Sequence, residues 1–332
     1  MKKELMDVSV VICCYTEERW NYIVQAVDSV KQQTVPPQEI IVVVDHNPAL
    51  FTRIQREISG VRVVENSEPR GISGARNSGV AAANSEILAF LDDDAVAYPD
   101  WLAQLMAAYT DPNVLGVGGT IDSHWETGRP SWFPEEFDWV VGCTYRGVPT
   151  TLSPVRNLIA ANMSTRSEVF ARVGAFQNGI GRLGKIPIGC EETEFCIRAL
   201  QMWPEGRFLY EPKARVYQHV PPARARWQYF QMRCYAEGIS KSQVVRHVGG
   251  NDGLSAERAY TLYILPMGVL RGIGDLLRGD RHGGGRAAAI TAGLAITTYG
   301  YLLGSLRNRW TQLQQRRQTT TYPQTTYAQR GG

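Results

Sequence analysis

Four short runs of apolar, mostly β-branched residues alternate with helical patterns in the N-terminal third of the chain. The runs are residues 8–14 (VSVVICC), 39–44 (EIIVVV), 61–64 (VRVV) and 86–91 (EILAFL). In the gaps apolar residues recur three or four positions apart, as at Ile23, Val27 and Val30, which is the spacing of an amphipathic helix. Strands that alternate with helices favour a parallel sheet covered on both faces. We therefore expect an α/β fold.

Acidic residues follow two of these expected strands. Asp45 comes after the second run, and Asp92, Asp93 and Asp94 end the fourth. Sheets of this kind bind ligands at the carboxyl ends of their strands, so we expect these acids on one rim. Adjacent carboxylates repel each other and are costly to remove from water. A hard divalent cation such as Mg²⁺ or Mn²⁺, which also binds substrate phosphates, would relieve that repulsion. For the triplet alone, a solvated turn or a helix cap explains it equally well.

Other nucleotide-type sheets are excluded by missing motifs. The first strand runs into CYTEER and not into G-x-G-x-x-G, and neither a P-loop nor a G-x-S-x-G elbow occurs. The net charge of +3 is too small to indicate a nucleic-acid partner. The hydrophobic fraction of 44% is typical of a globular protein. The six cysteines show no metal-ligand spacing, which favours buried thiols in a reducing compartment.

The order of the motifs resembles the family 2 glycosyltransferases, which have the GT-A fold. The resemblance covers about residues 7–220 and rests on VSVVICCYTEE, IIVVVDHN, ENSEPRGISGARNSGVAAANSEILAFLDDDAVAYPDWL, NMSTRSEVFARVGAF and GCEETEFCIRA. It implies a GT-A type, parallel-rich sheet flanked by helices. The C-terminal third would then be a helical extension of that fold.

The resemblance also implies residues that hold the donor nucleotide. Tyr15 would lie against the base and Glu17 near the ribose or base. Asp45 would accept a hydrogen bond from a uracil-type ring. Arg70 and Arg76 would meet the base or the diphosphate. The alternatives are a core aromatic for Tyr15 and a helix cap for Asp45.

The D-x-D motif of the family corresponds to Asp92 and Asp94. Asp94 is expected to be the direct metal ligand, and Asp93 to face the ribose or the sugar. A late histidine completes the metal shell in several GT-A enzymes, which makes His219 the candidate third ligand. An ordinary core or loop histidine is the alternative.

A second carboxylate pair, Glu191 and Glu192, opens an expected helix. Many family members carry Glu-Asp here, and the second residue acts as the catalytic base, so Glu192 inherits that role and Glu191 would orient a hydroxyl. Without the upstream motifs, acids at a helix N-terminus, where the helix dipole favours them, are the simpler explanation.

The function implied is an inverting transfer of a sugar from a nucleotide-diphospho-sugar, by default a UDP-sugar, to a hydroxyl of a glycan or lipid-linked acceptor. A nucleotidyltransferase-like sugar-nucleotide enzyme and a non-catalytic glycan- or lipid-binding protein on the same scaffold are the alternatives.

The C-terminal third is basic and partly apolar. Residues 207–246 hold eight Lys and Arg against two acids, and residues 287–306 form a run of 20 residues without a charge. Such segments suit docking on the cytoplasmic face of a membrane; a packing lid or a homo-oligomer interface is the alternative. We expect four regions: a nucleotide-sugar half at 1–118, an acceptor and catalytic half at 119–220, a helical region at 221–310 and a disordered tail at 311–332.

Overall fold

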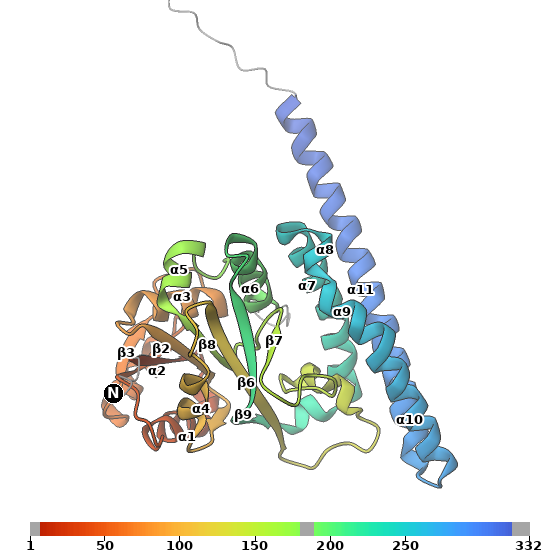
Figure 1. Cartoon of the computed structure of the whole chain (residues 1–332), viewed down its shortest axis with the longest axis horizontal. Helices are drawn as coiled ribbons and strands as arrows, with labels where there is room; N and C mark the ends of the chain where they lie inside the picture. Colours follow the sequence, from red (N-terminus) through yellow and green to blue (C-terminus); the bar gives the residue numbers. More distant parts are fainter. Residues whose placement is uncertain (1–6, 180–188, 321–332) are drawn as a thin grey trace, which may run out of the picture.

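The computed structural model describes residues 7–179 and 189–320, and it contains one mixed sheet flanked by helices (Figure 1). The sheet has nine strands in the order β3-β2-β1-β4-β8-β6-β9-β5, with β7 paired to β9. The strands are β1 (Val8–Cys14), β2 (Glu39–Val44), β3 (Arg62–Glu65), β4 (Ile87–Asp92), β5 (Ala95–Ala97), β6 (Val114–Trp125), β7 (Ser153–Val155), β8 (Asn162–Arg166) and β9 (Arg207–Val220).

The helices of the described residues cover the sheet and then extend beyond it. They are α1 (Trp20–Lys31), α2 (Pro48–Glu57), α3 (Ile72–Ala82), α4 (Trp101–Ala107), α5 (Ser167–Val173), α6 (Glu191–Met202), α7 (Trp227–Val248), α8 (Gly250–Gly253), α9 (Ser255–Ala259), α10 (Leu265–Leu277) and α11 (Arg281–Thr320). Short 3₁₀ segments are η1 (Glu17–Arg19), η2 (Glu135–Val141) and η3 (Pro222–Ala225), and η4 (Tyr260–Ile264) is a π-helical turn.

Strands β1 to β4 form the parallel core that the sequence predicts. β1 pairs in parallel with both β2 and β4, and β2 pairs in parallel with β3. Side chains of one strand alternate between two cores: Val10 and Ile12 pack with α1 and α2, whereas Val11 packs with α3. Because both faces are covered, β1, β2 and β4 are largely apolar, whereas the edge strand β3 begins with Arg62 and ends with Glu65. The predicted fold class is confirmed.

The middle of the chain departs from the expected pattern. The run near residues 206–210 predicts a short strand, and in the structure it is the first part of β9, which continues to Val220 alongside β6. The aromatic, proline-containing stretch at 125–142 predicts a loop, and in the structure it contains η2, Glu135–Val141. The six cysteines, all within the described residues, are free, and five of them are buried.

Helices α7 and α11 pack closely because glycines face the contact. A Cβ on Gly238 would lie 2.1 Å from the Thr297 carbonyl oxygen, and one on Gly300 would lie 2.3 Å from that of Tyr235. Helix α11 runs on to Thr320, past the boundary that the sequence suggested at residue 310; residues 321–332 of the expected tail lie outside the described residues.

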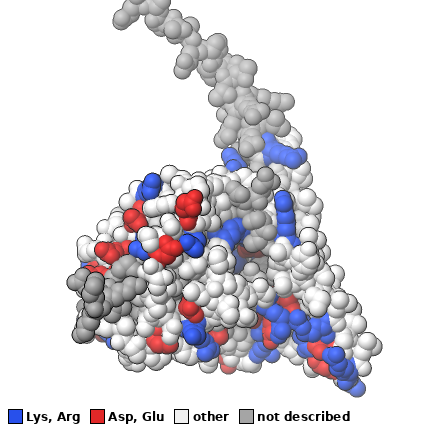
Figure 2. Space-filling model, viewed as in Figure 1, with Lys and Arg blue, Asp and Glu red and all other residues white. Residues whose placement is uncertain are grey.

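Helices α10 and α11 form an arm at the side of the sheet (Figure 1). Its surface exposes large apolar side chains, among them Leu270, Leu276, Leu277 and Leu302. Lys and Arg side chains gather along this arm (Figure 2). Among the described residues, 281–310 of α11 form the one helix whose length and composition would allow it to cross a membrane, and a third of its most apolar stretch is buried.

Candidate active site

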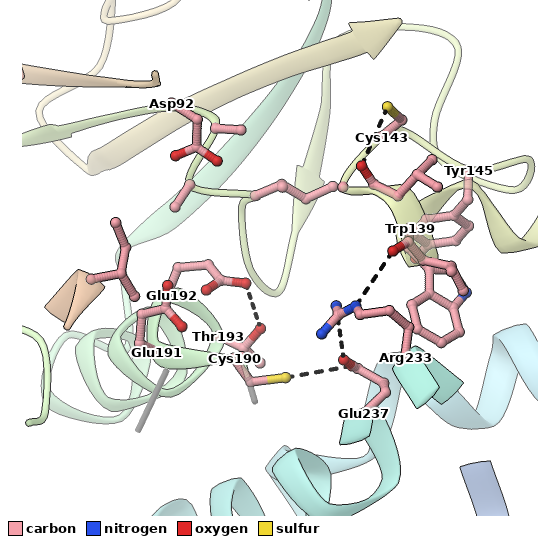
Figure 3. Close-up of a pocket in the computed structure, with 18 of the residues that line it drawn as sticks. Asp92, Trp139, Cys143, Tyr145, Cys190, Glu191, Glu192, Thr193, Arg233 and Glu237 are labelled. Atoms are coloured by element: carbon pink, nitrogen blue, oxygen red, sulfur yellow. Dashed lines mark hydrogen bonds and ion pairs between the residues drawn. The ribbon is translucent and has the colours of Figure 1, made fainter. Parts of the chain in front are cut away.

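A cavity of about 1330 Å³ lies between the carboxyl edge of the sheet and the C-terminal helices (Figure 3). One side, the sheet wall, is formed by Tyr15, Arg19, Asp45, Arg76 and the triplet Asp92–Asp94. The opposite side, the helix wall, is formed by Arg233, Glu237, Lys241, Tyr260 and Leu265. The Glu191–Glu192 pair, at the start of α6, lies between the two walls (Figure 3).

Parallel pairing brings the strand ends of the sheet wall together. Cys14 of β1 is in register with Val44 of β2, and Cys13 is in register with Asp92 of β4. Tyr15, Asp45 and the Asp triplet, which follow or end these strands, therefore share one rim, as the sequence predicts. Tyr15 is half-exposed and lies under the guanidinium of Arg19, 5.4 Å from the ring centroid.

Asp45 holds the glycine-rich turn that opens α3. Its Oδ2 accepts from the backbone N–H of Gly71 at 3.1 Å, and its Oδ1 accepts from Asn66 at 2.6 Å. Gly71 has a φ of 137°, a conformation that favours glycine. Asp45 is not a cap for α2, because Asn47 accepts from the N–H of Leu50 there. The carboxylate thus fixes the turn that carries Arg70 and Arg76.

Two arginines neutralise the buried part of the Asp triplet. Arg19 lies 2.6 Å from Asp93 and 3.4 Å from Asp94, and Arg224 lies 3.0 Å from Asp94. Burial raises the pKa of Asp93 to about 7, and the charges of Asp94 and Asp92 add to that rise against the effect of Arg19. Of the described buried polar atoms, Oδ2 of Asp93 is one with no hydrogen-bond partner. The triplet therefore carries a buried oxygen without a hydrogen-bond partner beside the cavity, which calls for an explanation.

Arg76 connects the two carboxylate motifs. Its guanidinium is buried and lies 3.1 Å from Asp92 and 2.5 Å from Glu191. The sequence predicted that Arg76 would contact the base or the diphosphate. In the structure, both terminal nitrogens of its guanidinium pair with carboxylates of the protein. Since a planar guanidinium holds two carboxylates in a fixed geometry, the end of β4 and the start of α6 are locked together.

Glu192 is the carboxylate of the pair that lacks such a cation. Burial raises its pKa to about 8, the neighbouring Glu191 adds to the rise, and Arg76 opposes it. Thr193 Oγ1 lies 3.5 Å from its Oε1. A carboxylate with a pKa near neutrality, facing a cavity, has the property of a general base.

Three other predicted site residues lie at the margin of the cavity or away from it. Arg70 lines the rim and donates to the carbonyl of His46 at 3.1 Å. The described residues that line the cavity include neither Glu17 nor His219. The ring of His219 stacks on Tyr22 at 4.6 Å, and its Nε2 lies 3.2 Å from Gln25 Oε1. Its role as a metal ligand stays a prediction.

Sequence reasoning missed Arg19 and two charged residues of the helix wall, Glu237 and Lys241. Arg19 could have been found from its place directly after the first strand, next to Tyr15. Glu237 and Lys241 gave no such signal, since an i, i+4 pair of opposite charges is typical of an exposed helix face. The position of Arg224, in the basic stretch directly after His219, predicts a cation for the leaving diphosphate; in the structure Arg224 lies buried at the sheet wall, paired with Asp94.

Comparisons with known proteins agree with this geometry. Residues 9–174 match the model of the family Glycosyl transferase family 2. The chain is 37% identical over 240 residues to the glucosyl-dolichyl phosphate glucuronosyltransferase of Haloferax volcanii, which covers 71% of this chain and 76% of that protein. It is 23% identical over 254 residues to the succinoglycan biosynthesis protein ExoM of Rhizobium meliloti, which covers 74% and 77%.

A solved structure supports the fold. The mannosyltransferase PcManGT from Pyrobaculum calidifontis, in complex with GDP-Man and Mn²⁺, superposes with a TM-score of 0.58 at 17% identity, over 90% of this chain and 91% of that one. At this identity the likeness bears on the fold alone.

Proposed function

The chain belongs to glycosyl transferase family 2 and is a nucleotide-sugar glycosyltransferase, and we propose that it inverts the anomeric centre and transfers the sugar to a hydroxyl of a lipid-linked acceptor. The observation that carries the proposal is the Arg76 bridge. It fixes Asp92, from the donor motif, and Glu191, beside the candidate base Glu192, in one cavity.

The donor binds along the sheet wall in this proposal. Tyr15 provides a half-exposed ring for the base, and Arg70 lies beside it on the rim. We assign Asp93 to the ribose or the sugar, since it lines the cavity between the two residues of the D-x-D motif. The partly buried Arg19 and the buried Arg224 supply positive charge near the departing diphosphate. We take a UDP-sugar as the default donor, with other nucleotides as outcomes of the donor screen.

The residues of the sheet wall fit a divalent cation. Asp92 and Asp94 line the cavity and offer hard carboxylate oxygens. Asp93, the residue between them, has a carboxylate oxygen, Oδ2, without a hydrogen-bond partner. No cluster of three or more His, Cys, Asp or Glu arranged for a metal occurs within the described residues. Mg²⁺ is commonly held by one or two carboxylates together with substrate phosphates, so two aspartates suffice. A bound Mg²⁺ or Mn²⁺ supplies charge that offsets the leaving diphosphate.

Glu192 carries out the proton transfer. The acceptor hydroxyl oxygen forms the new bond to the anomeric carbon from the face opposite the leaving group, and its proton passes to a carboxylate oxygen of Glu192. The bond from the anomeric carbon to the diphosphate oxygen breaks, and its electron pair leaves with the nucleoside diphosphate. Glu191, held by Arg76, orients the attacking hydroxyl. One direct displacement inverts the configuration, and no nucleophilic side chain of the protein is required.

The acceptor class rests on two observations. The relative in Haloferax volcanii is a glucosyl-dolichyl phosphate glucuronosyltransferase, which suggests a sugar carried on a lipid phosphate. The arm of α10 and α11 exposes leucines and carries exposed arginines such as Arg278 and Arg281. Apolar side chains interspersed with cations suit the interface of an anionic membrane. We therefore propose that the enzyme works at a membrane surface, as the sequence predicts for its cytoplasmic face.

A product assay tests the proposal. The purified chain is incubated with Mn²⁺, a panel of UDP-, GDP- and dTDP-sugars and a short prenyl-phosphate-linked glucose, and both nucleoside diphosphate and lipid-linked product are measured. We expect one donor to give a lipid-linked disaccharide with inverted linkage, and EDTA to stop its formation. Donor hydrolysis without transfer to any glycan or lipid acceptor would overturn the proposal.

A further inference from the structure

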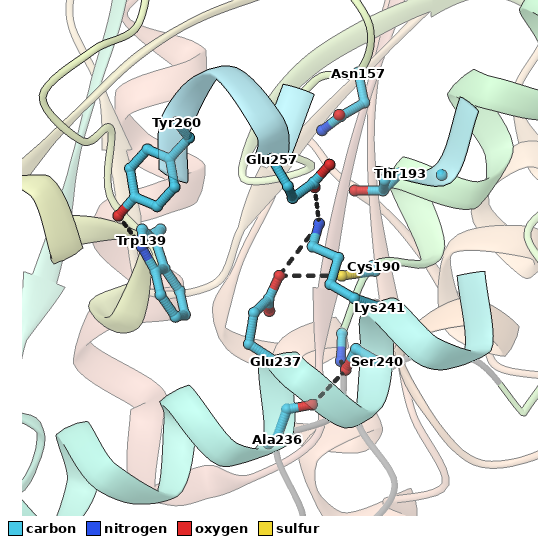
Figure 4. Close-up of polar contacts among 12 residues, drawn as sticks. Trp139, Asn157, Cys190, Thr193, Ala236, Glu237, Ser240, Lys241, Glu257 and Tyr260 are labelled. Carbon is cyan, nitrogen blue, oxygen red and sulfur yellow. Dashed lines mark hydrogen bonds and ion pairs between the residues drawn. The ribbon is translucent and has the colours of Figure 1, made fainter. Parts of the chain in front are cut away.

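A second group of charged side chains lines the same cavity away from the Asp triplet. We call it the helix-side cluster. Its members, from the loop after β7, from α7 and from α9, are Arg156, Arg233, Glu237, Lys241, Glu257 and Arg258. Figure 4 shows Lys241 between Glu237 and Glu257. The reaction proposed above uses none of these side chains.

The cluster is a connected network of ion pairs. Glu257 accepts two hydrogen bonds from Arg156, at 2.6 and 2.8 Å, and lies 2.8 Å from Lys241 Nζ. Lys241 also lies 3.3 Å from Glu237, whose other oxygen is 4.0 Å from Arg233. Burial alone would raise the pKa of Glu257, but Lys241 and Arg156 outweigh burial and hold this pKa at about 2. The network therefore remains charged across the physiological range.

The network contains more cations than anions. Four basic side chains face two carboxylates, and Lys241 sits within the network with little exposure. Arg233 lies 4.0 Å from Glu237, and Arg258 is exposed. The Cys190 thiol, at the N-terminus of α6, lies 3.4 Å from Glu237, and the first turn of that helix carries its own acids, Glu191, Glu192 and Glu194. The six side chains of the cluster thus carry a net positive charge, which suits an anion.

The cluster lies close to the candidate base. Lys241 opposes the rise in the pKa of Glu192 that burial and Glu191 cause, which places its charge within electrostatic reach of that carboxylate. An anion bound at the cluster would therefore sit beside the hydroxyl that Glu192 deprotonates. In a sugar linked to a lipid through phosphate, the phosphate is one sugar ring away from such a hydroxyl.

Apolar side chains continue the cavity beyond the cluster. Leu262, Leu265, Leu294 and Tyr301, from η4, α10 and α11, line the same space. These helices carry the exposed leucines of the arm. The cavity thus presents the candidate base, then the helix-side cluster, then apolar side chains. A ligand that matches these three surfaces has a hydroxyl at one end, an anionic group in the middle and an apolar chain at the other end.

We infer that the helix-side cluster binds the phosphate of the lipid-linked acceptor, with Arg233 and Arg258 as its adjustable contacts. The inference rests on the proposed function, because it assigns a subsite within the same cavity. The donor also carries phosphate groups, but in the proposed function its diphosphate binds beside Asp92 and Asp94 at the sheet wall.

A binding experiment tests the subsite without turnover. Farnesyl phosphate, farnesol and inorganic phosphate are titrated into the full chain, the Arg233→Gln/Arg258→Gln variant and an Arg246→Gln control, with intrinsic fluorescence as readout. Arg246 is exposed on the same helix α7 and is outside the described lining of the cavity. We expect the double variant to bind farnesyl phosphate at least tenfold more weakly, and the control to bind it like the parent chain. Equal affinity in all three proteins, or binding of inorganic phosphate as tight as that of farnesyl phosphate, would overturn the inference.

An activity experiment separates this inference from the proposed function. The kcat/KM for a citronellyl-phosphate-linked glucose is divided by that for the citronellyl glucoside, which lacks the phosphate. We expect this ratio to fall at least tenfold in the double variant and to stay unchanged in Arg246→Gln. Transfer with an unchanged ratio refutes the subsite and leaves the function standing. Where neither acceptor is used, the function fails, and the binding titration alone decides the subsite. Arg258→Gln alone, at an exposed position, repeats both measurements if the double variant unfolds.

Discussion

The two walls of the cavity carry similar numbers of charges but hold them by different means. At the sheet wall the carboxylates lie at the ends of strands, and backbone hydrogen bonds between these strands fix their order. Arg19, Arg76 and Arg224 come from other parts of the chain and form ion pairs with these carboxylates. At the helix wall Glu237 and Lys241 share one helix, and Glu257 reaches them from α9. The sheet wall offers acidic oxygens neutralised by arginine, whereas the helix wall offers an excess of cations.

This difference teaches how one cavity can treat two phosphate-bearing substrates separately. Under the two proposals above, the carboxylates of the sheet wall would bind a diphosphate only with a cation between them, so donor binding would depend on metal. The helix wall would bind phosphate directly, so acceptor binding would not. Changes at the sheet wall should therefore alter donor use, and changes at the helix wall should alter acceptor use.

The largest expected effect lies where the walls meet, at Glu192. Replacing Glu192 by Gln keeps its shape and removes the base, so kcat for transfer should fall by about 10²–10⁴-fold. Donor affinity, measured by calorimetry with Mn²⁺, should stay near that of the parent chain, since the sheet wall is intact. The matched control is Glu205→Gln, an exposed glutamate without cavity contact. A Glu192→Gln variant with full kcat would show that another group takes the proton.

The next effect tests whether the sheet wall depends on its arginine bridge. Replacing Arg76 by Met leaves Asp92 and the buried Glu191 without their shared cation, which should lower the free energy of unfolding by about 3–5 kcal/mol. Chemical denaturation measures it. The control is Arg207→Met, which breaks a half-exposed pair with Asp111 and should cost about 1 kcal/mol or less. Equal losses in the two variants would contradict a bridging role.

The comparison also separates what the sequence could predict. The strands at 8–14 and 39–44 were predicted to the residue because a strand buried on both faces is a continuous apolar run. The shared rim of Asp45 and Asp92 followed from parallel strand order. The position of a residue in the chain was enough for these features.

Features that depend on contacts between distant elements were not predictable. The sequence predicts only the start of β9, because Pro212, Lys213 and Arg215 interrupt the apolar pattern of the strand. The strand continues past these residues because its backbone pairs with that of β6. Gln218 and His219 are consecutive residues of β9. Because successive side chains of a strand point to opposite faces, only one of the two can line the cavity, and that residue is Gln218. No local pattern says which of the two faces inward. The helix-side cluster likewise exists only through the packing of α7 against α9 and the loop after β7.

Glu192 should also make stability depend on pH. Its pKa is raised from 4.5 in the unfolded chain to about 8 in the fold, first by burial and then by Glu191. A raised carboxyl pKa gives a stability contribution that is full below about pH 4.5 and is lost as the pH rises through 8. The slope is at most about 1.4 kcal/mol per pH unit. Urea denaturation from pH 4.5 to 9 should show a flatter profile for Glu192→Gln than for the Glu205→Gln control, and parallel profiles would refute the shift.

The smallest expected effect concerns the outer side of the helix wall, which has no counterpart at the sheet wall. Leu270 and Leu277 are 62% and 82% exposed on α10, whereas Leu152 is 50% exposed on the sheet side of the molecule. If the arm docks on a membrane, replacing either α10 leucine by Glu removes part of the roughly 1.5–3 kcal/mol that burying a leucine contributes. Binding to anionic vesicles, measured by co-sedimentation, should then weaken about tenfold. The same change at Leu152 should leave vesicle binding unaltered, because that leucine precedes β7 and belongs to neither α10 nor α11. Equal losses at all three positions would mean that the apolar surface of α10 is not what meets the lipid.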